Sequence, residues 1–364
     1  MIVILTQCFP SRVGGIETLM YNIALHLSYS NDVVVLADQQ NFKEDNIFDQ
    51  NEINFSTKRF RGIKFLRNRK KFNKLKKIHT SSKIDAVISD SWKSLEVTID
   101  FLKKNRIPVI SLAHGNEIII KNNKHHNRVR KILEYANAIV VNSNYTKSLL
   151  NKISNNFQNV KTIYPGINIK KNYIEENINL NKGSPILLTL ARLEKRKGHA
   201  LILKSIMNLK KYFPNIQYII AGEGEELNNI KNKIKEYNLQ DNVNLVGTVN
   251  ENQKNYIFSN TDLMIMPTLD ESSAKSIEGF GIAYIEAANF KIPSIASDVG
   301  GTPEAVIHNK TGLIIKGIDE LDQAIKSLID NKEKRLDLGQ NAKIRAENEL
   351  NWDIQIKKYN DLIK

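Results

Sequence analysis

The 364-residue chain has almost no cysteine, since Cys8 is its single thiol. One thiol can neither close an intramolecular disulfide nor supply a cysteine cluster for zinc, so we expect a reducing compartment. Long apolar runs are also missing, and none approaches the roughly 20 residues of a membrane-spanning helix. The first residues, MIVILTQCFP, have a short apolar run with no basic region before it, which predicts a strand and not a signal peptide. These absences predict a cytoplasmic protein.

Strands and helices are expected to alternate along the whole chain. Its length is too great for one ordinary core and suits two domains of roughly 150 to 200 residues each. The runs that we expect to form strands are IVILT, DVVVLAD, DAVISD, IPVISLAH and AIVVNS in the first half, then PILLTLA, QYIIAGEG, NVNLVG, DLMIMP, IPSIAS and TGLII. This alternation predicts an α/β protein with parallel, doubly wound sheets. Because the pattern restarts after a polar, Asn-rich stretch, we place the domains at 1–168 and 169–349.

The net charge of +14 suggests an anionic partner, and part of it is concentrated in one segment. Residues 58–77 contain no acidic residue and eleven basic ones: Lys58, Arg59, Arg61, Lys64, Arg67, Arg69, Lys70, Lys71, Lys74, Lys76 and Lys77. The interleaved apolar residues are Phe60, Phe65, Leu66, Phe72 and Leu75, at spacings compatible with one side of a helix. This combination predicts docking on an anionic membrane surface. A solvated basic face is the alternative, and no recognised module supports nucleic acid as the partner.

Ligands of doubly wound sheets bind beyond the carboxyl ends of the strands, so the loops there are candidate sites. Gly14 and Gly15 follow the first expected strand and precede an amphipathic helix, whose backbone amides can hold a phosphate. A tight turn is the alternative interpretation. The pattern G-x-G-x-x-G is absent from this loop, so a nicotinamide dinucleotide has little support.

Three loops of the second half have the same placement. Arg192 and Lys197 lie between a strand and a helix, where two cations suit a diphosphate. Gly222 and Gly247 lie at the ends of the next two expected strands, and the second leaves small apolar groups that can flank a nucleobase.

The segment SIEGFGIAYIEAA, residues 276–288, contains two carboxylates, Glu278 and Glu286, separated by seven residues. Gly281 and Ile282 can present free amides at a helix N-terminus, which favours an anion. Eight steps at about 1.5 Å each would separate the glutamates by roughly 12 Å along a helix, farther than the carboxyl pair of a glycosidase. The pair is better suited to binding different hydroxyls. A nucleotide sugar supplies both those hydroxyls and the diphosphate.

In these motifs the chain resembles the retaining glycosyltransferases of family 4 (glycosyl transferase group 1), which have the GT-B fold of two facing Rossmann-like domains with a cleft between them. The E-x7-E pattern of the family matches Glu278 and Glu286, and its Arg-x4-Lys pair matches Arg192 and Lys197. Further matches are the glycine pair at 14–15, AHGNE at 113–117, YPGIN at 164–168 and DVGGTPEAVIHNKTGLII at 298–315. The resemblance covers essentially the whole chain.

The resemblance implies a role for each matching residue. The catalytic residues would be His114, Glu278, Arg192 and Lys197. The donor-binding residues would be Gly14, Gly15, Gly222, Gly247, Phe280, Gly281, Ile282 and Glu286. Glu286 would bind the nucleotide ribose, Glu278 the transferred sugar, and the two cations the diphosphate. His114 alone suits a structural hydrogen bond equally well, but the resemblance places it where positive charge develops at the anomeric carbon.

The implied reaction proceeds with retention and without a metal or cofactor, in agreement with the absence of an Asp-x-Asp pair from the sequence. No nucleophile is evident, so the leaving diphosphate would take the acceptor proton, and catalysis would consist mainly of positioning and charge stabilisation. The first domain would bind the acceptor and the second the nucleotide sugar. A C-terminal helix at about 350–364 would pack back on the first domain.

The resemblance implies a hexosyltransferase, with mannose as one candidate sugar, that uses a GDP- or UDP-sugar. The acceptor would be a cell-envelope glycan, as in lipopolysaccharide biosynthesis, or a lipid-linked molecule, and the enzyme would be peripheral on the inner face of the membrane. No residue decides between guanine and uracil. A nucleotide-sugar epimerase of the same fold and a noncatalytic anion-binding protein are the alternatives, although E-x7-E and YPGIN favour the transferase.

Overall fold

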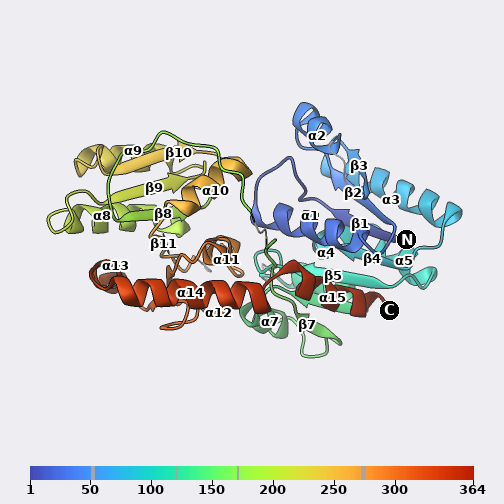
Figure 1. The fold of residues 1–364 in the computed structure, drawn as a ribbon. Helices are drawn as coiled ribbons and strands as arrows, with labels where there is room; N and C mark the ends of the chain where they lie inside the picture. Colours follow the sequence, from blue (N-terminus) through green and yellow to red (C-terminus); the bar gives the residue numbers. More distant parts are fainter. Residues whose placement is uncertain (51–53, 120–121, 170–171, 272–275) are drawn as a thin grey trace. The chain divides into compact units, whose positions relative to one another are not determined.

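The computed structural model describes residues 1–364 except 51–53, 120–121, 170–171 and 272–275. The chain forms two compact units, and the first is discontinuous (Figure 1). Unit 1 consists of Met1–Gly166 together with Trp352–Lys364, and unit 2 is Ile167–Asn351. The divisions therefore lie at 166 and 351, against the 168 and 349 that we drew from the sequence.

Unit 1 contains a seven-stranded parallel sheet with the order β3-β2-β1-β4-β5-β6-β7. Its strands are β1 (Ile2–Thr6), β2 (Val33–Asp38), β3 (Ser56–Phe60), β4 (Ala86–Ser89), β5 (Val109–Ala113), β6 (Ala138–Val141) and β7 (Val160–Thr162). The strand order reverses between β1 and β4, which pair in parallel. The loops after these two strands therefore lie at the topological switch point, where such sheets bind ligands.

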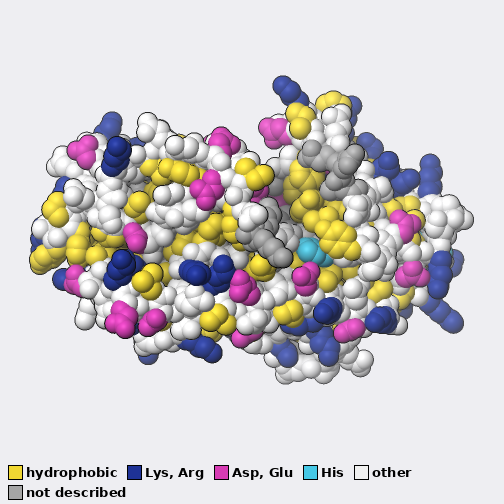
Figure 2. Space-filling model, in the orientation of Figure 1, with side chains coloured by type: hydrophobic (Ala, Val, Ile, Leu, Met, Phe, Trp, Pro, Cys, Tyr) yellow, Lys and Arg dark blue, Asp and Glu magenta, His cyan; other side chains and the backbone are white. Residues whose placement is uncertain are grey.

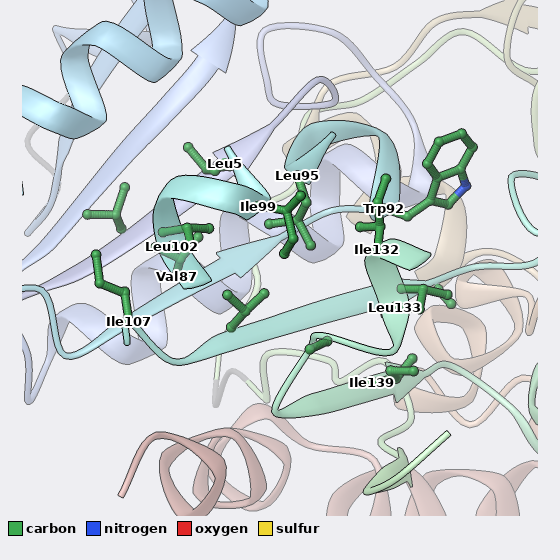
Figure 3. Packing of buried hydrophobic residues seen from close by; sticks show 14 of the residues in the cluster. Leu5, Val87, Trp92, Leu95, Ile99, Leu102, Ile107, Ile132, Leu133 and Ile139 are labelled. Carbon is green, nitrogen blue, oxygen red and sulfur yellow. The ribbon is translucent and has the colours of Figure 1, made fainter. Parts of the chain in front are cut away.

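Helices cover both faces of this sheet. They are α1 (Gly15–Ser28), α2 (Phe42–Asp49), α3 (Lys64–Ser81), α4 (Trp92–Leu95), α5 (Ile99–Lys104), α6 (Asn123–Leu133), α7 (Asn144–Asn151) and α15 (Trp352–Ile363). Alternate residues of a strand point to opposite faces, so Leu5 joins one core with Leu95 and Leu102 (Figure 3). Ile4 joins the other core, which contains residues of α1 and Trp352 of α15. The C-terminal helix is thus part of the core of unit 1.

Unit 2 contains a six-stranded parallel sheet with the order β10-β9-β8-β11-β12-β13. Its strands are β8 (Ile186–Leu190), β9 (Gln217–Ala221), β10 (Val243–Gly247), β11 (Leu263–Met266), β12 (Ser294–Ser297) and β13 (Gly312–Ile315). Its helices are η1 (Lys195–Lys197), α8 (His199–Leu209), α9 (Leu227–Glu236), α10 (Glu251–Ser259), α11 (Ile282–Asn289), α12 (Thr302–Ala305), η3 (Ile318–Glu320), α13 (Leu321–Asp330) and α14 (Lys332–Glu349). The order reverses between β8 and β11, which form the second switch point.

Two parallel, doubly wound sheets confirm the predicted α/β fold class. None of the helices within the described ranges combines the length and the apolar composition needed to cross a bilayer.

Candidate functional site

Two loops meet at the switch point of unit 2. One follows β8 and contains η1, and the other follows β11 and leads to α11. Because Leu187 of β8 pairs with Leu263 of β11, the two loops leave the same edge of the sheet. The amide of Leu269 donates to the carbonyl oxygen of Arg196 at 2.7 Å, which fixes one loop against the other.

These loops bring together an unbroken row of five charged side chains. Glu278 Oε2 accepts from Lys197 Nζ at 2.5 Å and from Arg196 Nη1 at 2.7 Å. Arg196 Nε reaches Glu194 Oε2 at 3.0 Å, and Glu194 Oε1 reaches Arg192 Nη1 at 2.8 Å. We call these residues the charged row. Arg192 is its exposed end, with 57% of the side chain accessible, whereas Glu278 at the other end is buried.

The row contains three cations and two carboxylates, so it carries one excess positive charge. Burial raises the pKa of the Glu278 carboxyl, but the charges of Lys197 and Arg196 outweigh burial and hold that pKa below its usual value. Glu278 is therefore ionised at neutral pH. Burial lowers the pKa of His199, the first residue of α8, to about 4, so this imidazole is neutral and adds no charge.

The second predicted carboxylate has a different partner. Glu286 Oε1 accepts from Lys254 Nζ of α10 at 2.7 Å, and Lys254 also contacts Glu251 at 2.7 Å. Burial alone would lower the pKa of Lys254, but the two carboxylates hold it above its usual value. Sequence reasoning missed both Lys254 and Arg196. In the sequence, each of the two is simply a basic residue in a chain that is rich in basic residues, which does not mark it as part of a site.

The predicted glycines of unit 2 serve close packing and capping. A Cβ on Gly222 would lie 2.0 Å from the carbonyl oxygen of Ala191, and the Gly222 amide donates to Gly247 O at 2.7 Å. That amide is therefore already used within the sheet. Gly281 has φ of 99° and caps α11, and its neighbour Phe280 is buried.

His114 lies in unit 1, directly after β5. Its Nε2 is 2.9 Å from the carbonyl oxygen of Asp90, so Nε2 carries the hydrogen and donates. The His114 amide donates to Glu117 Oε1 at 2.7 Å. The Asp90 carboxylate in turn accepts from Thr6 Oγ1 at 3.0 Å and from the Gln7 amide at 2.7 Å. The loops after β1, β4 and β5 are thus joined at one edge of this sheet.

The glycine pair of unit 1 has an acidic neighbour. A Cβ on Gly14 would lie 2.3 Å from Glu17 Oε2, and Glu17 Oε1 contacts Arg12 Nε at 3.0 Å. The amide end of α1 therefore already has a carboxylate beside it. A phosphate role for Gly14 and Gly15 stays a prediction.

The basic segment 58–77 is not one amphipathic element. It spans β3 and α3, and several of its side chains are internal. Arg59 contacts Asp45 at 3.0 Å, whereas Arg67 and Lys71 contact Asp38 at 3.0 and 2.5 Å. Phe60 and Leu75 pack in or against a core. Arg59, Arg67 and Lys71 therefore already have acidic partners within the unit, and docking of the segment on a membrane stays a prediction. Figure 2 shows that many Lys and Arg side chains nevertheless gather over α3.

Of the predicted site residues, the structure joins Arg192, Lys197 and Glu278 through Glu194 and Arg196. Glu286 lies in the same unit with its own cation, whereas His114 and the glycine pair belong to unit 1. Within the described ranges, no three His, Cys, Asp or Glu side chains gather as a set of metal ligands.

Two family models match the chain. "Glycosyltransferase Family 4" covers residues 13–171 and "Glycosyl transferases group 1" covers 170–345. Among curated proteins, the GDP-mannose-dependent monoacylated alpha-(1-6)-phosphatidylinositol monomannoside mannosyltransferase of Corynebacterium glutamicum is 22% identical over 376 residues. That alignment covers 99% of this chain and 97% of the relative.

Two solved structures are similar over 99% of this chain and 98% of their own. Sucrose-phosphate synthase from Thermosynechococcus elongatus has a TM-score of 0.82 at 20% identity. Anabaena Alr3699/HepE in complex with UDP has a TM-score of 0.78 at 18% identity. At these identities the likeness shows the shared fold alone.

Proposed function

Since this chain belongs to the family 4 (group 1) glycosyltransferases, we propose that it transfers a hexose from a GDP- or UDP-sugar to a cell-envelope or lipid-linked acceptor, with retention. The observation that carries the proposal is the state of Glu278 and Glu286. Each carboxylate is held through one oxygen, Glu278 by two buried cations and Glu286 by the partly buried Lys254. Among the described residues, no hydrogen bond or ion pair involves the second oxygen of either. Two fixed acceptors with a free oxygen suit the hydroxyls of a nucleotide sugar.

The charged row supplies the other half of donor binding. Arg192 is exposed at the sheet edge and can form paired hydrogen bonds to phosphate oxygens. The excess positive charge of the charged row compensates the negative charge of the diphosphate as the bond to the anomeric carbon breaks. Lys197 is committed to Glu278 at 2.5 Å, so in this proposal it adds charge to the diphosphate site while it holds the carboxylate.

The acceptor hydroxyl attacks from the face that the diphosphate leaves, and the diphosphate takes its proton. Glu278 accepts from hydroxyls of the transferred sugar, and Glu286 accepts from the ribose. His114 stabilises the positive charge that develops at the anomeric carbon. Its Nε2–H donation to Asp90 leaves Nδ1 as an acceptor for a substrate hydroxyl. The remaining contribution is positioning and preorganised charge.

GDP-mannose is the first donor to test, because the Corynebacterium relative depends on it. UDP-sugars are the second choice, because the Anabaena neighbour was solved with UDP. We would screen GDP-, UDP- and ADP-sugars by thermal shift and by hydrolysis or transfer, with Glu278→Gln as the inactive control. An epimerase would invert the sugar without an acceptor, and a noncatalytic protein would shift in melting temperature without turnover. Either result would overturn the transferase proposal.

A lipid-linked acceptor would require contact with a membrane. We assign this contact to residues 61–66 at the start of α3, which we call the docking tip. Ile63, Phe65 and Leu66 are exposed there, Phe65 by 64%. Arg61 and Lys64 are exposed beside them. Each basic residue near an anionic bilayer contributes about 1 kcal/mol, and exposed apolar side chains can enter the headgroup region. We propose a peripheral enzyme on the cytoplasmic face that docks through this tip.

Vesicle sedimentation tests the docking tip. Binding should rise with anionic lipid, fall with salt, and drop several-fold in an Arg61→Gln, Lys64→Gln, Phe65→Ser variant. Lys76→Gln with Lys77→Gln removes the same charge at the exposed far end of α3 and is the matched control. Arg67 and Lys71 are left unchanged because their ion pairs are internal. Equal binding by both variants would mean that the tip does not dock.

A further inference from the structure

We infer that Arg196 is a positioning residue of the transfer reaction. It fixes Glu278 through one carboxylate oxygen, so that the other oxygen is held ready for the transferred sugar. This inference rests on the proposed function, because it requires Glu278 to contact that sugar.

The guanidinium of Arg196 is a rigid link in the charged row. Its Nη1 contacts Glu278 Oε2 at 2.7 Å and its Nε contacts Glu194 Oε2 at 3.0 Å, so both edges of the planar group are held. Only 7% of the side chain is accessible. The carbonyl of the same residue accepts from the Leu269 amide at 2.7 Å. Backbone and side chain of Arg196 therefore both connect η1 to the loop that carries Glu278.

The way in which the two oxygens of Glu278 are used distinguishes positioning of this carboxylate from simple neutralisation of its charge. A carboxylate with two cationic neighbours could meet one with each oxygen, but Arg196 and Lys197 both meet Oε2. Oε1 has no hydrogen bond or ion pair to any residue that the structure describes. Two donors that converge on Oε2 from different side chains prevent the carboxylate from turning, and Oε1 is left with a fixed direction.

Stability alone gives a weak reason for this arrangement. Buried ion pairs pay a desolvation penalty that their attraction often fails to repay, and apolar residues of similar size commonly replace them without loss. Lys197 by itself already neutralises Glu278. A second buried cation is better explained by the need for a carboxylate that is both fixed and permanently ionised, since Arg196 also contributes to lowering the pKa of Glu278.

The experiment compares Arg196→Ala and Arg196→Lys with Lys195→Ala. Lys195 is an exposed cation in the same turn and is the matched control for the loss of charge. The wild type is assayed first with its best donor and acceptor. It gives the reference values of kcat, of donor KM and of the pH at which kcat falls on the acid side. Arg196→Ala should lower kcat by about 10- to 100-fold with donor KM within about threefold, as expected for an interaction used mainly in the transition state.

The pH profile is the readout that a merely structural role would not move. Burial raises the pKa of Glu278, and in Arg196→Ala only one cation instead of two opposes this effect. The pKa of Glu278 should therefore rise, and the acid limb of kcat should move to higher pH. Arg196→Lys keeps the charge but lacks the planar fork, so it should restore the acid limb while kcat recovers only in part. Arg196→Lys also keeps the test open if the alanine variant does not fold. Lys195→Ala should match the wild type in both quantities.

Two failures can be told apart. If the wild type transfers sugar and both Arg196 variants keep its kcat and acid limb, Arg196 does not position Glu278 and this inference is wrong. A loss of activity in Arg196→Ala that tracks a lower melting temperature, with an acid limb unmoved from that of the wild type, would likewise make Arg196 structural. If the wild type transfers no sugar from any donor, the proposed function itself is wrong.

Discussion

Glu278 and Glu286 belong to one short segment, but the structure holds them in different ways. Glu278 has 11% of its side chain accessible and two cations on one oxygen, whereas Glu286 has 23% accessible and one lysine. The charged row around Glu278 has an excess of one positive charge. Around Glu286 the excess is one negative charge, because Lys254 faces Glu251 as well. The first surroundings suit a diphosphate and a reacting sugar, and the second suit neutral hydroxyls.

This contrast predicts different kinetic effects. A fixed, buried carboxylate beside the leaving group can act more strongly on the transition state than on the ground state, and then its loss lowers kcat. A more open carboxylate that binds a ribose acts equally on both states, and its loss raises KM.

The largest effect is expected from Glu278→Gln. The amide offers the sugar no charged oxygen and takes the paired carboxylate away from buried Lys197, whereas Arg196 keeps Glu194. Removing one partner of a buried pair costs about 3–5 kcal/mol, so the melting temperature should fall as well. We expect kcat to fall by more than about 100-fold at little change in donor KM. Steady-state kinetics and thermal unfolding measure both effects, and near-normal turnover would remove Glu278 from the reaction.

Arg192→Ala should come next, with a loss in kcat of about 100-fold, because it removes a preorganised charge at the leaving group. Since Arg192 is mostly exposed and contacts only Glu194 among the charged row, the melting temperature should barely change. This variant therefore separates catalysis from stability, which Glu278→Gln cannot do. Normal kcat in a folded Arg192→Ala enzyme would place the diphosphate elsewhere.

Glu286→Gln should raise donor KM by about tenfold and change kcat less, in the range expected for one lost hydrogen bond to a charged group. Lys254→Met leaves Glu286 without its cation and should raise KM in the same direction. In Glu286→Gln, Lys254 keeps Glu251 as its counter-charge. The loss of stability in this variant should therefore be smaller than in Glu278→Gln. If Glu286→Gln instead lowers kcat as strongly as Glu278→Gln, the two carboxylates have no separate roles.

The fold was largely predictable because its central strands are apolar throughout. All eleven expected runs contain a strand, and β1 coincides with IVILT. The missed strands, β3 and β7, are the edges of the sheet in unit 1. Their sequences, STKRF and VKT, are partly exposed and polar. An edge strand buries less side-chain surface than a central one, so its sequence carries a weaker signal.

The site was predictable where a spacing carries meaning and unpredictable where a partner comes from elsewhere in the chain. Glu278 and Glu286 follow from their separation, and Arg192 and Lys197 follow from their place after a strand. Arg196 and Lys254 pair with glutamates 82 and 32 residues away. In a Lys-rich chain nothing local distinguishes such a cation from a solvated one. The internal ion pairs of Arg67 and Lys71 escaped notice for the same reason.

The smallest expected effect is none: activity should survive EDTA. The excess positive charge lies at Glu278, where the diphosphate is proposed to bind. A divalent cation would repeat the role that we propose for Arg192, Arg196 and Lys197. The test is kcat after dialysis against EDTA, and again after Mg²⁺ or Mn²⁺ is added. A full loss that only the metal restores would show that the charged row does not compensate the leaving group. It would also remove the basis for expecting a larger effect at Arg192 than at Glu286.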